Sequence, residues 1–321
     1  MGERSKVYMT DLRCRPGVSL LNKLEKLMRT AGIGEINFER KLVAIKMHFG
    51  EPGNLAFLRP NYAKVVADVV KSLGGVPFLT DCNTLYPGRR KNALEHLDAA
   101  YENGFSPLST GCQVIIGDGL RGNDDVEVPV EGAEYIQTAK IGKAIMEADV
   151  IISLSHFKGH EQTGFGGAIK NLGMGCGSRR GKMEQHAQGK PMVAPRRCVG
   201  CRMAEYAKAV VDGRPQFHIS LVIDVSPYCD CHGENDLPIV PDVGMFASFD
   251  PVALDQACAD ACGKQSPIPG SHLDEQMHRE GFCDKHDHFI NSMPDTDWRV
   301  CLDHCEKIGI GTRSYELVEV K

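Results

Sequence analysis

The stretch from residue 156 to residue 180 concentrates side chains that could bind an anion. It places the cations Lys170, Arg179 and Arg180 in a run of glycines. Glycines allow positive backbone dihedrals and let main-chain N–H groups approach an anion closely. We therefore predict an anion cradle in this stretch. The candidate cofactor-binding residues in it are Gly164, Gly166, Gly167, Lys170, Asn171 and Arg179.

Four histidines are candidate metal ligands. His156 and His160 are four residues apart, a spacing that would place both side chains on one face of a helix. Gly159 and the loop character of the stretch argue against a helix, so two hydrogen-bonded polar residues are the alternative. His48 and His186 would complete such a site if the fold brings them close.

Cysteines form a second group of candidate ligands. Cys198 and Cys201 have the C-x-x-C spacing with which two thiolates reach one metal or one cluster. A [4Fe-4S] cluster needs further ligands, and a thioredoxin-like pair is disfavoured because no strand precedes these residues. Cys229, Cys231 and His232 follow a predicted strand, and the two sets together would make a site of four cysteines, or of three cysteines and one histidine. Two pairs at helical spacing, Cys258 with Cys262 and Cys301 with Cys305, are interpreted as small buried thiols. Cys283 is interpreted as part of a polar surface loop.

Two nucleotide-binding motifs are excluded. Gly181-Lys182 is followed by Met183 and lacks the opening glycine of a Walker A loop. The G-x-G-x-x-G pattern that begins at Gly117 does follow a strand, but residues 126–130 have strand character where a dinucleotide-binding fold needs a helix.

The composition is that of a folded globular protein in a reducing compartment. Of 321 residues, 42% are hydrophobic and 25% are charged, which excludes a disordered or low-complexity chain. The net charge of -5 gives no basic field for nucleic acid, and no stretch has the length and apolarity of a membrane span. The 13 cysteines, in a chain too long for a disulfide scaffold, suit free or metal-bound thiols. We expect a cytoplasmic protein without nucleic-acid or membrane partners.

The pattern of elements predicts an α/β fold. In the first half, strands are expected at 6–12, 42–49, 76–81, 114–117 and 150–154. They are separated by helices, one capped by Ser19 and closed by Gly32, and others at 61–73, 91–102 and 140–147. Strands joined by crossover helices pair in parallel, so we predict a doubly wound, largely parallel sheet.

Polar side chains follow four of these strands. Lys46 and His48 end one strand, Asp81 ends the next, Asp118 follows a third and His156 a fourth. Because ligand sites form at the carboxyl ends of parallel strands, these clusters favour one shared crevice, and Lys46 joins the candidate cofactor-binding residues.

The second half of the chain is less regular. We expect a helix at 202–211, strands at 217–225 and 244–248, a helix that begins at Asp250-Pro251 and runs to Cys262, a helix at 297–307 and a strand at 315–320. From its length alone the chain could form one large α/β unit or two smaller lobes. We expect two lobes, residues 1–190 and 203–321, joined by a short segment at 191–202, with bounds implied by the family resemblance described next.

These motifs resemble the DUF362 family, often named ferredoxin-like or iron-sulfur proteins. The resemblance covers nearly the whole chain and rests on residues 46–54, 156–160, 164–173, 229–236 and 250–255. Many relatives carry a two-cluster ferredoxin module after a Gly-Lys-Pro like Gly189-Lys-Pro191. This chain keeps only Cys198-Val-Gly-Cys201 there, as if the module were shortened to a stub. The resemblance implies an iron-sulfur or metal cofactor, with electron transfer left in doubt.

A more distant resemblance is to nickel-pincer lactate racemase. His160, the Gly164–Gly167 stretch, Lys170 and His186 are similar in order and spacing to its motifs. The resemblance implies that His160 is a proton-transfer base, Lys170 a cofactor tether and His186 a metal ligand. Such roles are chemically consistent, because imidazole moves protons near neutral pH and a desolvated lysine can become nucleophilic. The second catalytic histidine of that enzyme has no counterpart, so racemase activity does not follow.

Three hypotheses remain open. In the leading one, the crevice binds a metal or an anionic cofactor that serves redox or metal-dependent chemistry on a small anion. The protein would then be an oxidoreductase or an isomerase. A redox protein partner is compatible with this hypothesis. The second is a non-enzymatic metal or iron-sulfur protein that uses Cys198, Cys201, Cys229, Cys231 and His232. The third is a scaffold with a vestigial site.

Overall fold

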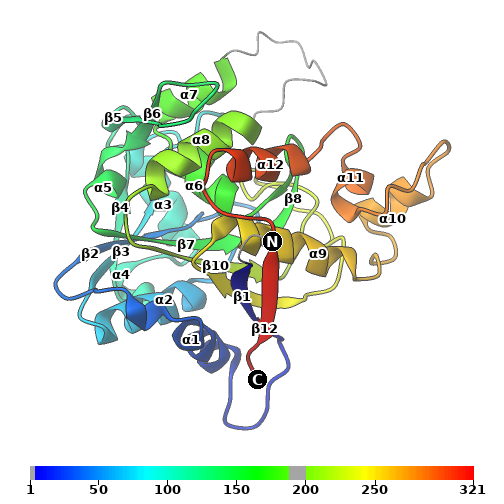
Figure 1. The fold of residues 1–321 in the computed structure, drawn as a ribbon, viewed down its shortest axis with the longest axis horizontal. Helices are drawn as coiled ribbons and strands as arrows, with labels where there is room; N and C mark the ends of the chain where they lie inside the picture. Colours follow the sequence, from blue (N-terminus) through cyan, green and yellow to red (C-terminus); the bar gives the residue numbers. More distant parts are fainter. Residues whose placement is uncertain (1–3, 188–199) are drawn as a thin grey trace.

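A largely parallel sheet forms the centre of the molecule (Figure 1). The computed structural model describes residues 4–187 and 200–321. Eight strands pair in the order β12-β1-β11-β10-β7-β2-β3-β4, and all neighbours are parallel except those of β11, which runs opposite to β1 and β10. These strands are β1 (Ser5–Thr10), β2 (Leu42–Lys46), β3 (Val76–Asp81), β4 (Gln113–Ile116), β7 (Val150–His156), β10 (Gln216–Val222), β11 (Gly244–Ser248) and β12 (Tyr315–Glu319).

Two small hairpins accompany the sheet. One consists of β5 (Asp125–Pro129) and β6 (Thr138–Gly142), and the other of β8 (Lys158–His160) and β9 (Gly164–Gly166). Strands from both predicted lobes belong to the one central sheet, since β7 pairs directly with β10. The division of the chain into lobes stays a prediction.

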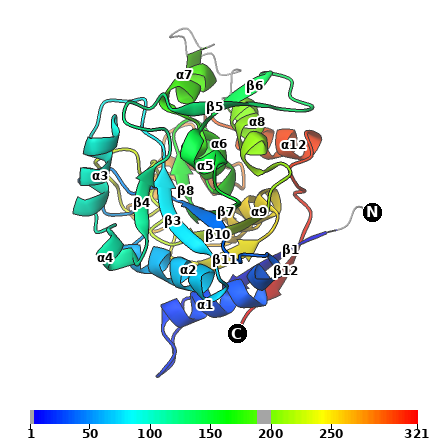
Figure 2. The ribbon, with the colours of Figure 1, turned by 90° about the vertical axis from the view of Figure 1, so that its left-hand side faces the viewer.

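Helices cover both faces of the sheet, as a doubly wound fold requires (Figure 2). On one face, α1 and α2 pack against each other and enclose one apolar core; on the other, α6, α8, α9 and α12 enclose a second. The helices are α1 (Leu20–Thr30), α2 (Pro60–Ser72), α3 (Ala93–Glu102), α4 (Pro107–Thr110), α5 (Lys143–Met146), α6 (Ala168–Cys176), α7 (Arg179–Ala187), α8 (Gly200–Val211), α9 (Pro251–Gly263), α10 (His272–Met277), α11 (His288–Ser292) and α12 (Arg299–Lys307), with a 3-10 turn η1 (Ile33–Glu35). The predicted fold class is confirmed.

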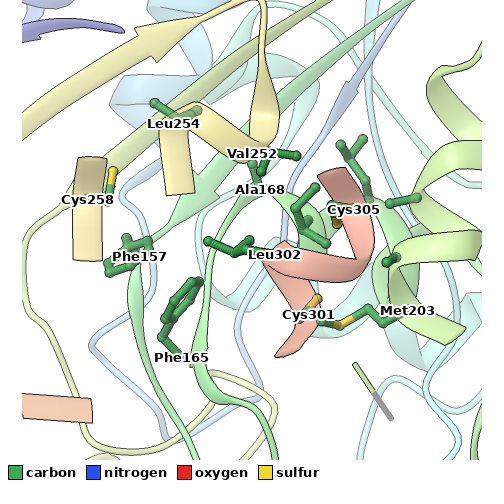
Figure 3. Packing of buried hydrophobic residues seen from close by; sticks show 14 of the residues in the cluster. Phe157, Phe165, Ala168, Met203, Val252, Leu254, Cys258, Cys301, Leu302 and Cys305 are labelled. Carbon is green, nitrogen blue, oxygen red and sulfur yellow. The ribbon is translucent and has the colours of Figure 1, made fainter. Parts of the chain in front are cut away.

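Aromatic and sulfur-containing side chains fill the second core (Figure 3). Phe157, just before β8, and Phe165 of β9 pack with ring centroids 4.8 Å apart beside Leu302 of α12. Cys301 lies next to Met203 of α8. This packing fixes the hairpin and α6 against the C-terminal helices.

Local sequence signals position several helices as predicted. Ser19 forms a capping box with Asn22 at the start of α1. Asp250 accepts the backbone N–H groups of Val252 and Ala253, and Pro251 occupies the first position of α9.

One predicted helix is wrong in its first part. The expected helix at 140–147 begins only at Lys143, because Lys140–Gly142 belongs to β6 and pairs with Asp125–Glu127 of β5. The two-stranded ladder satisfies backbone groups that the helix would otherwise have satisfied within itself. Within the parts of the chain that the structure describes, no helix combines the length and apolarity needed to cross a membrane.

Candidate metal centre

Two thiols lie close together just beyond β10. Cys229 and Cys231 hydrogen-bond to each other, and Cys229 is fully buried. The Cys231 hydrogen bond lowers the pKa of Cys229 well below its usual value; burial opposes this shift, and Lys170 and His160 reinforce it. The pKa of Cys231 is raised, because this thiol donates to the Cys229 sulfur and is itself buried. Of the two thiols, Cys229 is therefore the one that loses its proton more readily.

Lys170 of α6 faces the sulfur atom of Cys229. Its Nζ lies 3.2 Å from Cys229 Sγ. Burial alone would lower the pKa of Lys170, but its interactions with Cys229, Cys231 and Glu161 outweigh burial and raise it. Without a ligand, Lys170 is therefore an ammonium ion, whereas the sequence led us to expect a nucleophilic amine.

Three side chains beside the thiols form a ready set of metal donors. Single ligand atoms of Glu161, Cys231 and His232 lie within 4.8 Å of one another, and His232 Nε2 lies 2.7 Å from Glu161 Oε1. Glu161 Oε2 is buried, and the described residues supply it with no hydrogen-bond partner. Thiolate, imidazole and carboxylate are the donors that bind borderline-soft divalent ions, so these residues fit such an ion.

Two further histidines lie around the same space. The Nδ1 of His160 accepts the backbone N–H of Gln162, so that its Nε2 is left to interact with Cys229. His186 of α7 lies 3.2 Å from the Tyr86 hydroxyl through Nε2. Burial and the positive charges of Lys170, His160 and Lys182 lower the pKa of His186. The sequence-predicted residues His160, Lys170, His186, Cys229, Cys231 and His232 are thus brought together.

Asp230, between the two cysteines, is held by the side chains of His156 and Lys158. Its carboxylate lies 2.9 Å from His156 Nδ1 and 3.1 Å from Lys158 Nζ. Burial opposes the shift, but these two charges hold the pKa of Asp230 below its usual range. The other nitrogen of His156 donates to the Ile223 carbonyl oxygen at 2.8 Å. Both nitrogens of His156 are engaged, so in this arrangement His156 positions the thiol loop and has no free nitrogen for a metal.

The buried Arg90 guanidinium connects the thiol loop to the loop that carries Tyr86. It pairs with Glu51 at 2.7 Å, lies 2.8 Å from His48 Nε2, and reaches the Cys231 carbonyl oxygen at 3.5 Å. The backbone carbonyl oxygen of Arg90 accepts the Thr84 N–H at 2.7 Å, which closes the loop that contains Tyr86. His48 therefore contacts Arg90, with its other ring nitrogen bonded to the Gly50 N–H.

The predicted anion cradle at the start of α6 is filled by the chain itself. The carboxyl group of Asp255 accepts the N–H groups of Ala168 at 2.6 Å and Ile169 at 2.9 Å. A Cβ on Gly167 would overlap an Asp255 carboxyl oxygen, so glycine is needed there for this approach. Gly164 and Gly166 form β9 beside it. The glycines thus admit an internal carboxyl group to the helix N-terminus.

The remaining predicted residues lie elsewhere. Lys46 is buried between Asp81 at 2.9 Å and Asn171 at 2.8 Å, which ties β2 to α6. Arg179 donates to the Lys91 carbonyl oxygen at the start of α7. Cys201 lies near Tyr135 and Lys307, in the first turn of α8. Cys198 lies outside the described residues.

Three residues of the site escaped sequence reasoning. Glu161 lies in the stretch 156–180 and follows His160 directly, but it was not predicted as a ligand. Tyr86 and Arg90 lie in a polar loop after β3, and their position beside the thiols depends on tertiary contacts. For Glu161, its position next to the candidate histidine His160 was a sequence signal that could have indicated a metal ligand.

The architecture and the site define a doubly wound α/β protein with a cluster of thiol, imidazole and carboxyl groups beyond the carboxyl ends of its strands. Residues 43–260, more than half of the chain, match the family described as "Domain of unknown function (DUF362)". The chain belongs to this family.

This chain is also similar to a curated protein and to solved structures. The thylakoid-associated protein sll1697 of Synechocystis sp. is 29% identical over 163 residues, which are 49% of this chain and 46% of that protein. The match thus spans about half the length of that relative. The lactate racemase apoprotein of Thermoanaerobacterium thermosaccharolyticum is 15% identical with a TM-score of 0.42, over 68% of this chain and 51% of that one. A Thermotoga maritima protein is 14% identical with a TM-score of 0.45, over 76% and 57%. The racemase-like roles of His160, Lys170 and His186 stay predictions.

Proposed function

We propose that this chain is a metal-dependent enzyme whose ion is held by Cys229, Cys231, His232 and Glu161. The observation that carries the proposal is the buried Oε2 of Glu161, which finds no hydrogen-bond partner within residues 4–187 and 200–321 and lies among thiol and imidazole donors. A buried polar atom without a partner costs free energy, and a divalent cation of the Zn²⁺ or Ni²⁺ type would supply that partner.

The surrounding side chains suit acid–base work on a small anion. A bound ion supplies Lewis acidity, which polarises a coordinated oxygen. His160 presents its Nε2 toward the thiolate side of the site and would hold or move a proton there. The Lys170 ammonium would orient and neutralise an anionic substrate. We assign these two residues the catalytic roles.

A single ion is favoured over an iron-sulfur cluster. Four thiolates hold such a cluster, whereas the site contains the thiols of Cys229 and Cys231. Cys201 lies instead near Tyr135, in the turn between β5 and β6, and near Lys307 of α12. The donor set is therefore one of mixed sulfur, nitrogen and oxygen.

Metal analysis of the anaerobically purified chain and titration with Co²⁺ test the proposal. We expect one ion per chain and thiolate-to-cobalt absorption. Cys231→Ser and Glu161→Gln should weaken Co²⁺ binding by more than about tenfold, while the exposed Cys283→Ser should bind as the parent does. Intact mass tests for a Lys170 adduct. Four iron and four sulfide per chain, or unchanged Co²⁺ binding by both site variants, would contradict the assignment.

A further inference from the structure

The backbone of the thiol loop, residues 229–236, is held by the loop that follows β2. The Glu51 N–H donates to the Asp230 carbonyl oxygen at 3.0 Å. The Asn54 side-chain amide donates to the His232 carbonyl oxygen at 3.1 Å. The two loops come from the ends of different strands, so these bonds join segments that lie far apart in the sequence.

Gly53 lets the two loops approach closely. Its φ of +101° lies in the left-handed region, and a Cβ at this position would lie 2.7 Å from the carbonyl oxygen of Gly233. Close by, the Leu55 N–H donates to Asn235 Oδ1 at 2.9 Å. The contact between the loops therefore extends beyond the metal donors on both sides of His232.

Asn54 is engaged at both atoms of its buried amide. Its Nδ2 donates to the His232 carbonyl oxygen, while its Oδ1 accepts the Ala56 N–H at 2.8 Å. One partner is an acceptor and the other a donor, so only one orientation of the amide satisfies both. Asn54 thus presents its donor to His232 in a fixed direction.

His232 needs this support when an ion binds. Its side chain is half-exposed, and in the metal-free protein its Nε2 lies 2.7 Å from Glu161 Oε1. Both side chains are ligands of the proposed ion, so a bound cation would replace their mutual hydrogen bond. The bond from Asn54 goes to the backbone and is kept. A ligand whose backbone is already held loses less conformational freedom when the ion binds.

We infer that Asn54 is a positioning residue of the metal centre and acts on the ion through the backbone of His232. This inference rests on the proposed function and adds a residue that is not itself a ligand. Groups that support a metal ligand contribute about tenfold or more to metal affinity.

Titration of Asn54→Asp with Co²⁺, followed by absorption, tests the inference. The aspartate keeps an acceptor for the Ala56 N–H but has no donor for the His232 carbonyl oxygen. We expect Co²⁺ affinity to fall by about tenfold and the ligand-field bands of the bound Co²⁺ to shift, because the imidazole direction changes. Asn54→Ser, which removes the amide without adding a charge, should change both quantities in the same direction.

Asn103→Asp is the matched control. The Asn103 amide donates to the carbonyl oxygens of Phe49 and Gly50 at 2.8 and 3.1 Å, so it holds the first residues of the same loop rather than the thiol loop. This variant should lose stability in urea, while its Co²⁺ affinity and spectrum should match those of the parent. A double-mutant cycle adds a second check: in a His232→Gln background, Asn54→Asp should cost no further affinity, because the ligand that it positions is absent.

The outcomes separate the two proposals. A parent chain that binds no Co²⁺ rejects the proposed metal centre and this inference with it. If the parent binds Co²⁺ and both Asn54 variants match it in affinity and spectrum, the metal centre stands and the role of Asn54 is overturned. Equal losses in Asn54→Asp and Asn103→Asp, or an undiminished Asn54→Asp effect in the His232→Gln background, also overturn it. Circular dichroism shows which Asn54 variant is folded, and the folded one decides.

Discussion

At the scale of single residues, Asp230 decides how the thiol loop is held. Its carboxylate receives a charged hydrogen bond from His156 and an ion pair from Lys158, and all three side chains are buried. Removing one member of a buried charged group costs more than a surface ion pair does, because the partners stay buried without compensation. The same group fixes Cys229 and Cys231 on either side of Asp230.

Asp230→Asn should therefore destabilise the protein and weaken its metal site. We expect a loss of about 3 kcal/mol in the free energy of unfolding, measured in urea. Co²⁺ affinity should fall by about tenfold, as is common when a residue that supports a ligand is lost. Asp236→Asn, a change at an exposed carboxylate nearby, should alter neither quantity. Equal stability of the two variants would show that the buried charges do not support the loop.

Residue patterns predicted part of the site. Cys229, Cys231 and His232 are close in sequence and follow a recognisable strand, so their meeting is a local matter. Tyr86 approaches His186 across 100 residues of sequence, and Arg90 reaches Cys231 across 141. Contacts of that span depend on sheet order, which periodicity does not specify.

At the scale of elements, α6 begins on a side chain that another helix supplies. Asp255 lies in α9, and its carboxyl group caps the first N–H groups of α6. The cap therefore joins two helices of the same face, and Lys170 follows the capped residues directly in the first turn of α6. This interaction requires that residue 167 have no side chain.

Gly167→Ala should displace Asp255 and destabilise the protein by about 1–3 kcal/mol, the cost of a lost cap and of an overpacked core. Gly263→Ala, at the end of α9 where a Cβ meets nothing within 4 Å, is the control and should be nearly neutral. Urea unfolding checks both. In a double-mutant cycle with Asp255→Ala, the Gly167→Ala effect should shrink. Strict additivity would argue against the proposed contact.

Element positions were predictable where the signals were local. The Ser19 cap of α1 and the Asp250-Pro251 start of α9 were both expected. The predicted start of the helix at residue 140 was wrong, because Lys140–Gly142 pairs with β5. This pairing is a contact between two strands, and the helical spacing of apolar residues does not predict it. The order of the central strands likewise depends on crossovers that the sequence pattern leaves open.

At the scale of the whole molecule, buried histidines make stability depend on pH. Burial lowers the pKa of His218 to about 3, and burial also lowers the pKa of His96 to about 3 although Asp81 opposes it. The unfolded chain binds protons at these sites near pH 6.5, while the folded chain does not. Each histidine therefore stabilises the fold above pH 6.5, and this contribution is lost as the pH falls toward 3.

His218→Asn should reduce the pH dependence of unfolding. The free energy of unfolding of the parent should fall below pH 6.5 by up to about 1.4 kcal/mol per pH unit for this histidine alone. Urea titrations between pH 6.5 and 4.5 should show that slope lost in His218→Asn, and kept in His278→Asn, where the ring is exposed. An identical slope in His218→Asn and the parent would exclude His218 as the source.

The position of β1 has a consequence for how the chain assembles. This strand pairs with β11 and β12, whose residues come more than 230 positions later in the chain. During synthesis on the ribosome, β1 therefore emerges more than 230 residues before the strands with which it pairs. Closing so long a loop is slow compared with pairing β2, β3 and β4, so the early half should collapse first with an open edge. Docking of β1 is then a late event that reports completion of the sheet.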